Sequence, residues 1–382
     1  MARAMVDSDK TEGRELFERL VALLRRPSGE SEETKASIIK ARPELDAFIE
    51  AHPHSVPALR LMAEVEERQG NRQQARALIH RAEIEDPWNP EILIIGETLG
   101  EAEAASNPHS DPVAAPWLDS KISSTVISPD DLAEKARGAY KLGDLERSYS
   151  LSKLAYLLEP KQGHHLLDAW TAGAALDPAR THRELRLLEP EASEEPFLYL
   201  ALGSIDNVLG RYEEAGFWLD KGLQLQPEDP YLMAMLLNEL AYVLARQEGR
   251  LDDCLALVRK ALEVFPNRSA NGFIRDTLGL IYLKRGQNDK ALRNLQEAVA
   301  KDPGVISRLH LTVAMLRVRD TPGALLQLQA IANSRPTLDT PHLEESQILR
   351  RIQNHLSKLE DLLNLGGVEE LQEAEKILAE LL

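Results

Sequence analysis

Residues 272–303 decide the fold, and they read GFIRDTLGLIYLKRGQNDKALRNLQEAVAKDP. Apolar and small residues recur at helical spacing in both halves of this stretch, at Leu278, Gly279, Tyr282, Ala291, Leu295 and Ala298. Gly286 lies between the halves and suits the left-handed position that ends a helix, and Pro303 closes the stretch. The stretch therefore predicts two short amphipathic helices joined by a tight turn. Gly279 and Ala291 are small enough to let the two helices pack closely.

The same pattern of small and apolar residues occurs in five other stretches of the chain. These stretches end at Pro87, Pro160, Pro227, Pro266 and Pro336. The period is roughly 33 to 38 residues, which is typical of helix-turn-helix repeats. A single hairpin of this kind cannot bury its apolar face, so the repeats must stack on one another. The sequence thus predicts an all-α solenoid in which Leu278, Tyr282 and Leu295 are buried.

The repeat resembles the tetratricopeptide repeat (TPR), whose pattern is W-x2-L-G-x2-Y, then A-x3-F and a closing proline. The matching positions are Leu278-Gly279, Tyr282, Ala291 and Pro303, with Leu295 in the position of the phenylalanine. The resemblance covers residues 56–336 except 106–129. It implies a right-handed superhelix of antiparallel helix pairs, roughly eight to nine hairpins long, with capping helices at its ends. The succession LNELAYVLA, TLGLIYLKRG and LTVAMLR is most similar to bacterial TPR proteins, some of which serve envelope and exopolysaccharide export systems.

The chain divides where this pattern changes. Residues 1–55 predict an N-terminal helical cap, in which Pro43 breaks a helix over residues 32–51, and residues 56–105 predict TPR-like repeats. Residues 106–129 hold four prolines and no sustained period, which predicts a linker or loop; alternatively, Trp117 packs this loop onto the stack. Residues 130–336 form the main array. Residues 337–382 predict two capping helices, although an acidic segment with a leucine stripe also fits a tail that folds into the groove described below.

Catalytic and metal-binding motifs are missing from the sequence. There is no phosphate-binding glycine loop, nucleophile elbow or zinc-protease helix motif. Cys254 is the one cysteine and stands where sister repeats have alanine, so we interpret it as a small buried residue. His164 and His165 are adjacent; because neighbouring residues on a helix point about 100° apart, we expect no metal site there. The sequence predicts a non-catalytic protein without cofactor or metal.

Charge and hydropathy narrow the classes of partner. The net charge is −17, which argues against general binding to nucleic acid, although residues 233–336 carry more basic than acidic side chains. No apolar run approaches the about 18 residues that a membrane-spanning helix needs, and the opening residues lack the apolar core of a secretory signal. We therefore expect a cytoplasmic protein without direct membrane insertion. A chain trimmed from a periplasmic or membrane-associated protein would read the same way.

The resemblance also locates a binding surface, because the first helices of successive TPR repeats line a concave groove that holds a peptide or amphipathic helix of a partner protein. On these helices, residues that the repeat pattern leaves unused recur three and four positions apart. They are Phe197, Leu200, Ser204, Asn207, Met235, Asn238, Tyr242, Phe273, Asp276, Leu280, Leu283, Ile306, Leu309, Val313 and Leu316. This largely apolar face predicts the partner-binding groove. The alternative is that the superhelix is tight and these residues pack against neighbouring helices.

TPR modules that serve heat-shock chaperones grip a C-terminal carboxylate with lysine, asparagine and arginine on the inner face. The corresponding positions here hold Leu200, Ser204, Met235, Glu239, Phe273 and Thr277. The clamp is missing, so recognition of chaperone C-termini is not expected.

The interpretation is a protein–protein interaction scaffold or adaptor, which the resemblance associates with a bacterial envelope or exopolysaccharide assembly. Two other classes stay open. One is a regulatory or substrate-recognition subunit of an enzyme complex. The other is a TPR protein that associates with itself as a homo-oligomer.

Overall fold

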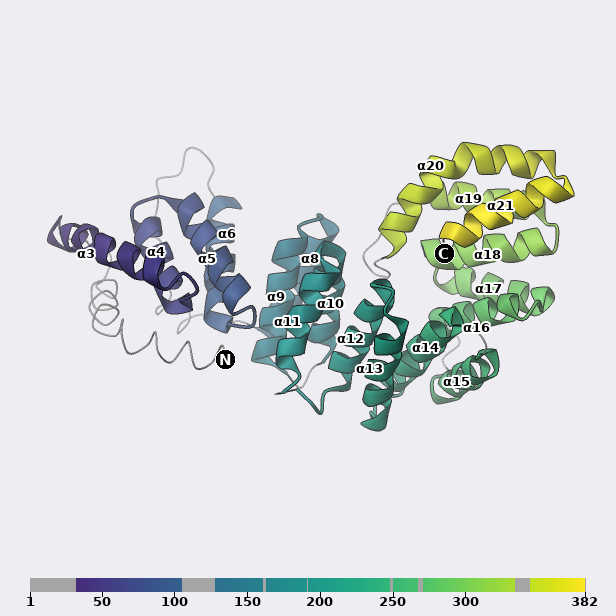
Figure 1. Cartoon of the computed structure of the whole chain (residues 1–382), viewed down its shortest axis with the longest axis horizontal. Coiled ribbons are helices and arrows are strands. Elements are labelled where there is room, and N and C mark those ends of the chain that lie inside the picture. Colours follow the sequence, from purple (N-terminus) through teal and green to yellow (C-terminus); the bar gives the residue numbers. More distant parts are fainter. Residues whose placement is uncertain are drawn as a thin grey trace. The chain divides into compact units, whose positions relative to one another are not determined.

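The computed structural model describes residues 32–104, 128–160, 163–190, 192–247, 250–266, 271–333 and 344–381. Within these ranges the regular elements are 18 helices, and no strand occurs among them (Figure 1). The all-α prediction is therefore confirmed. Residues 1–31 of the predicted cap and 106–127 of the predicted linker, Trp117 included, lie outside the described residues.

The chain forms two compact units, residues 1–169 and residues 170–382. We call them the N-terminal unit and the C-terminal unit. The division falls within helix α10 (His164–Leu176), whereas the sequence places a boundary at 106–129. A change in composition therefore does not mark the division between the two compact units.

The N-terminal unit consists of six helices and the start of a seventh in the described residues. In order, its helices are α3 (Glu32–Ala51), α4 (Val56–Arg68), α5 (Arg72–Glu85), α6 (Pro90–Ala104), α8 (Pro129–Lys141) and α9 (Leu145–Leu158), followed by the first residues of α10. Helix α3 continues through Pro43, so the predicted break is wrong. Pro43 is exposed, and the proline removes one backbone donor without ending the helix.

The C-terminal unit holds the most regular repeats. Its helices after α10 are α11 (Pro178–Leu188), α12 (Pro196–Val208), α13 (Tyr212–Gln224), α14 (Pro230–Arg246), α15 (Leu251–Val264), α16 (Gly272–Lys284), α17 (Asn288–Lys301), α18 (Val305–Arg317), α19 (Thr321–Ala332), α20 (Glu344–Leu365) and α21 (Val368–Leu381). Proline at the start of a helix is a recurring device: Asp229 precedes Pro230 and accepts from the Tyr231 N–H at 2.9 Å. Helices mostly pack against their neighbours in the chain, as the solenoid prediction requires.

The turns of four described hairpins, α4–α5, α8–α9, α12–α13 and α16–α17, each contain a glycine with a positive φ. Gly70, Gly143, Gly210 and Gly286 have φ values of 81°, 81°, 73° and 68°. The prediction of a left-handed residue at Gly286 is therefore confirmed. The hairpin α18–α19 has Arg319 at this place with φ 61°, so the turn forms there without glycine.

Close packing within a hairpin depends on a glycine in its first helix. A Cβ atom added at Gly279 would overlap the side chain of Leu295 on α17, and one added at Gly203 would overlap that of Leu219 on α13. Both leucines are fully buried. The Leu-Gly pair of the repeat is thus explained by the approach of the second helix.

The three residues that the sequence predicts to be buried differ in their exposure to solvent. Leu278 and Leu295 are buried, as predicted, but Tyr282 is half-buried. The Tyr282 ring packs against two core clusters, and the ammonium of Lys290 lies 5.5 Å from the ring centroid. Tyr282 therefore lies at the margin of the core, and the prediction that it is buried is wrong. The aromatic position of the repeat packs with one face and leaves its other parts accessible.

Replacing Leu295 with alanine is expected to lower the free energy of unfolding of the C-terminal unit by about 2–5 kcal/mol, because the truncation leaves a cavity between α16 and α17. Tyr282→Ala is expected to cost less, since the tyrosine ring is already half solvated. Urea unfolding followed by circular dichroism measures both losses. A Tyr282→Ala loss as large as that of Leu295→Ala would contradict the difference in burial.

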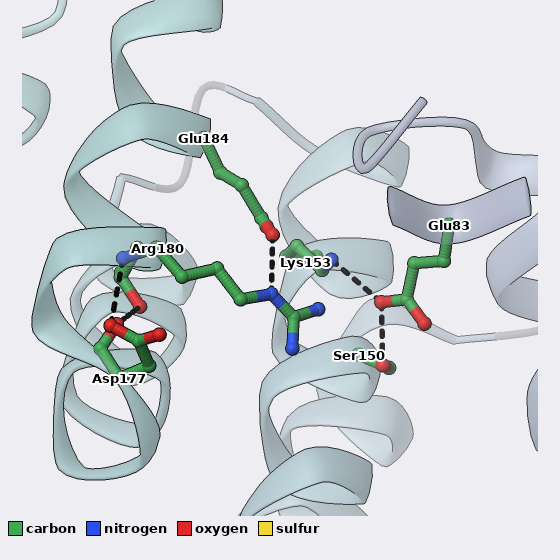
Figure 2. A network of polar contacts seen from close by, with 7 residues as sticks. Glu83, Ser150, Lys153, Asp177, Arg180 and Glu184 are labelled. Carbon is green, nitrogen blue, oxygen red and sulfur yellow. Dashed lines mark hydrogen bonds and ion pairs between the residues drawn. The ribbon is translucent and has the colours of Figure 1, made fainter. Parts of the chain in front are cut away.

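A charged side chain is enclosed in the N-terminal unit. Lys153 on α9 is fully buried, and its Nζ donates to Oε1 of Glu83 on α5 at 2.8 Å (Figure 2). The Ser150 hydroxyl donates to the same oxygen at 3.1 Å. Figure 2 also draws Arg180, which donates to Glu184 at 2.7 Å within α11 of the C-terminal unit. Buried ions of this kind are stable only while their partners balance the charge.

Helices α20 and α21 complete the C-terminal unit. Both pack against α18, and α20 also packs against α19. They bury Ile352, Leu359, Leu363, Ala374, Ile377 and Leu378 in one cluster with residues of α18 and α19. Arg317 at the end of α18 donates to Glu375 of α21 at 2.7 Å. This packing is what a capping pair of helices provides at the end of a solenoid.

Cys254 on α15 is fully buried, as the sequence analysis expects of a small apolar residue. Burial raises the pKa of its thiol, which opposes formation of a nucleophilic thiolate.

None of the helices in the described ranges is both long enough and apolar enough to cross a membrane.

Candidate partner-binding groove

A groove in the C-terminal unit is lined mainly by side chains of α12, α14, α16 and α18, the first helices of consecutive hairpins (Figure 1). The lining residues are Trp170, Leu200, Ser204, Asn207, Val208, Met235, Asn238, Glu239, Tyr242, Phe273, Asp276, Thr277, Asp302, Ile306 and Ser307. Its cavity volume is about 70 Å³, so the groove is narrow and admits a bound segment mainly at its surface.

Most of the residues predicted for the binding surface line this groove together. They are Leu200, Ser204, Asn207, Met235, Asn238, Tyr242, Phe273, Asp276 and Ile306. Leu200 is fully buried, whereas Met235, Tyr242 and Phe273 are half-buried and present part of their surface. The inner face is thus less exposed than the predicted continuous apolar strip.

The other predicted residues do not line the groove. Leu280, Leu283, Leu309, Val313 and Leu316 are buried, and Phe197 is half-buried against the core of α14 and α15. Leu283 and the three residues of α18 belong to the cluster that α20 and α21 complete. For these side chains the structure shows the alternative arrangement, in which they pack against neighbouring helices.

The groove also contains residues that the sequence analysis did not choose. They are Trp170, Val208, Glu239, Thr277, Asp302 and Ser307. Glu239 and Thr277 directly follow the predicted residues Asn238 and Asp276. Both occupy positions that the carboxylate clamp of chaperone-binding TPR modules uses. Trp170 comes from a shortened repeat, so the spacing of the regular repeats gave no signal for it.

Two side-chain amides in the groove have unused hydrogen-bonding capacity. Asn207 on α12 and Asn238 on α14 are buried, and the Oδ1 atom of each has no hydrogen-bond partner. An asparagine amide offers two donors and an acceptor, so it complements the N–H and C=O groups of a peptide bond. A buried polar atom left unpaired costs about 1–3 kcal/mol, which a bound amide group would recover.

A buried contact between a histidine and a carboxylate joins two of the helices whose residues line the groove. The Nδ1 atom of His310 on α18 lies 3.0 and 3.1 Å from the two carboxylate oxygens of Asp276 on α16. Both side chains are buried, at 1% and 6% exposure. The pair joins consecutive first helices, so it helps to fix the floor of the groove.

The lining of the groove is acidic although residues 233–336 carry a net positive charge. Glu239, Asp276 and Asp302 contribute carboxylates, and none of the described lining residues is lysine or arginine. Basic residues of these repeats instead make ion pairs with other elements, as Arg275 does with Glu297 at 3.0 Å. The sign of the charge in the groove therefore cannot be inferred from the net charge of the repeats.

Comparison with known proteins gives one family match and several similar structures. Residues 232–302 match the model of the family described as tetratricopeptide repeat. The human IFIT1 dimer with m7Gppp-AAAA is similar at 16% identity and a TM-score of 0.47, over 85% of this chain and 77% of that one. The APC/C hetero-tetramer Cut9-Hcn1 is similar at 16% identity and a TM-score of 0.45, over 88% of this chain and 62% of that one.

A tetratricopeptide repeat protein from Parabacteroides merdae is also similar, at 17% identity and a TM-score of 0.40, over 66% of this chain and 98% of that one. No curated protein matches the sequence. Similarities this low do not show what this chain binds. The family match identifies residues 232–302 as tetratricopeptide repeats, and hairpins on both sides of them also have a left-handed turn residue.

Proposed function

We propose that this protein is a non-catalytic scaffold that binds an extended segment of a partner protein in the groove of its C-terminal unit. The observation that carries the proposal is the pair of buried amides of Asn207 and Asn238, whose Oδ1 atoms have no partner in a groove with half-buried aromatic side chains. Tetratricopeptide repeats have interaction and scaffold roles, and their fold is typically non-catalytic. Both facts support the proposal.

An extended backbone suits these amides better than a helix does. In a helix the backbone N–H and C=O groups bond to one another, whereas an extended segment offers them to its surroundings. Asn207 and Asn238 lie on the first helices of consecutive hairpins. A segment that runs along the unit meets both amides, and its main-chain hydrogen bonds contribute affinity without fixing its sequence.

Side chains of the partner give the specificity. Met235, Phe273 and the indole of Trp170 provide apolar surface for at least one bulky apolar residue. The carboxylates of the lining favour a neutral or basic segment over an acidic one. A scaffold of this kind fits a bacterial envelope or exopolysaccharide assembly, which the resemblance of the repeats to those of bacterial TPR proteins implies.

Selection of random peptides displayed on phage against the full-length protein tests the proposal. Recovered peptides are expected to contain bulky apolar residues and to be depleted in aspartate and glutamate. Asn238→Ala is expected to weaken the binding of a recovered peptide about tenfold, because it removes a hydrogen-bonding amide from the groove. Fluorescence anisotropy with the labelled peptide measures the dissociation constant.

Asn294 provides the matched control. It lies on α17, and its Nδ2 atom donates to the carbonyl of Lys290 at 2.8 Å, so it takes no part in the groove. Asn294→Ala is expected to leave peptide affinity unchanged. Recovery of no peptide, or equal affinity for the Asn238→Ala and wild-type proteins, would overturn the proposal.

A further inference from the structure

Three metal-ligating side chains meet at one place in the N-terminal unit. Asp130 lies in the first turn of α8, and His164 and His165 begin α10. One ligand atom from each of these residues lies within 4.8 Å of the ligand atoms of the other two. Asp130 and His164 are exposed, and His165 is fully buried. Solvent therefore reaches the cluster from the side of Asp130 and His164.

The ring of His165 supplies an independent observation. Both of its nitrogens, Nδ1 and Nε2, are buried and have no hydrogen-bond partner. Its exposure is 0%, and its ring centroid lies 4.1 Å from that of His164. A buried polar atom is normally paired, and leaving one unpaired costs about 1–3 kcal/mol. A bound ion at the cluster would give one of these nitrogens a partner.

Charged groups of α8 and α10 surround His165. Burial lowers the pKa of His165, and His164 lowers it further, while Asp130 and Glu159 act in the opposite direction and Arg137 lowers it. Arg137 is itself paired with Asp168 at 3.1 Å, so its positive charge is partly balanced.

We infer that Asp130, His164 and His165 bind a divalent transition-metal ion of the Zn²⁺ class. Two imidazole nitrogens and one carboxylate oxygen suit Zn²⁺ and its neighbours, whereas Mg²⁺ and Ca²⁺ prefer oxygen ligands alone. Ligand atoms on a tetrahedral Zn²⁺ are about 3.3 Å apart, so modest side-chain rotations close the observed cluster around the ion. Three protein ligands leave one position for water or for a ligand from another molecule.

This inference reverses the expectation from the sequence. Adjacent residues on a helix do diverge by about 100°, but one ring nitrogen each of His164 and His165 still lies within 4.8 Å of the other and of a carboxylate oxygen of Asp130. The third ligand, Asp130, is 34 positions earlier and belongs to another helix. Spacing along the sequence therefore gives no sign of the site.

Titration of the full-length, EDTA-treated protein with Zn²⁺ alone tests the inference. Isothermal calorimetry is expected to show one equivalent bound with a dissociation constant in the micromolar range or tighter. Co²⁺ in place of Zn²⁺ is expected to give visible d–d absorption without a thiolate charge-transfer band, because the one cysteine, Cys254, is buried elsewhere. Absence of stoichiometric binding would overturn the inference.

Variants at the two exposed ligands locate the ion without disturbing the core. His164→Ala and Asp130→Asn are each expected to weaken Zn²⁺ binding at least about tenfold, since even residues that only support a ligand have effects of that size. His54→Ala is the control. Its Nδ1 lies 2.7 Å from Glu85, which makes it another exposed histidine–carboxylate pair in the same unit. Affinity unchanged in both ligand variants, or lost in His54→Ala, would place the ion elsewhere and overturn the assignment.

Discussion

Glu83→Leu is expected to lower the free energy of unfolding of the N-terminal unit by about 3–5 kcal/mol, which is typical when one member of a buried ion pair is removed. The ammonium of Lys153 is fully enclosed and donates to Glu83 at 2.8 Å. The rings of Tyr149 and Trp88 lie 4.5 and 5.9 Å from it, but a ring quadrupole replaces only part of a full negative charge. The substitution removes the carboxylate and leaves the cation in place.

A double-mutant cycle separates charge balance from packing. Combining Glu83→Leu with Lys153→Met is expected to recover most of the lost stability, because an apolar pair of similar volume needs no counter-charge. Hydrogen exchange of α5 and α9, read by mass spectrometry, reports this unit separately from the rest of the chain. Additive losses in the double variant would show that the pair has no electrostatic coupling.

A surface ion pair is the control for this cycle. Lys358 and Glu373 lie 3.0 Å apart in the C-terminal unit, and both side chains are well exposed. Glu373→Leu is expected to leave the unfolding midpoint unchanged, because solvent screens an exposed pair. A loss from Glu83→Leu no larger than from this control would contradict the role of burial.

Ending the chain at residue 343 is expected to produce the second large effect, a marked fall in thermal stability together with aggregation. The removed helices α20 and α21 bury six side chains against α18 and α19. A fully buried leucine or isoleucine contributes roughly 1.5–3 kcal/mol, and the face of α18 and α19 that they leave is apolar. Light scattering and binding of the dye ANS measure the exposed surface.

Two leucines on α20 make this prediction specific. Leu359 is fully buried and Leu365 is 71% exposed, so Leu359→Ala is expected to cost about 2–5 kcal/mol and Leu365→Ala almost nothing. The alternative from the sequence is a tail that folds into the groove. A shortened chain that stays soluble, keeps its stability and binds groove peptides more tightly would support that alternative and contradict the capping role.

The hairpin could be predicted from the sequence because its determinants are local. Gly286 must adopt a positive φ, and Gly279 must leave space for Leu295, so each constraint is visible within one repeat. The predictions that are wrong concern residue types that occur in more than one structural setting. Tyr282 matches the repeat pattern but is only half-buried. Pro43 indicates a break, although α3 continues through this exposed proline.

The candidate sites were harder to predict because they join residues that are distant in the chain. Trp170 reaches the groove from a shortened repeat, and the inner face of α18 is buried by helices that follow it. The pairing of Lys153 with Glu83 spans 70 positions, and the cluster of Asp130 with His164 and His165 joins the starts of two helices. Periodicity reports which face a residue occupies, but not which distant side chain it meets there.

Packing between sequence neighbours has a consequence for the time course of synthesis. Each hairpin can close soon after it leaves the ribosome, because its contacts span short loops and need no distant segment. The apolar face of the pair α18–α19 is covered by α20 and α21, which follow it in the chain. At about 5–20 residues per second, these helices emerge roughly 2 to 10 seconds after α19. During that interval the nascent chain exposes the apolar face of α18–α19 to solvent.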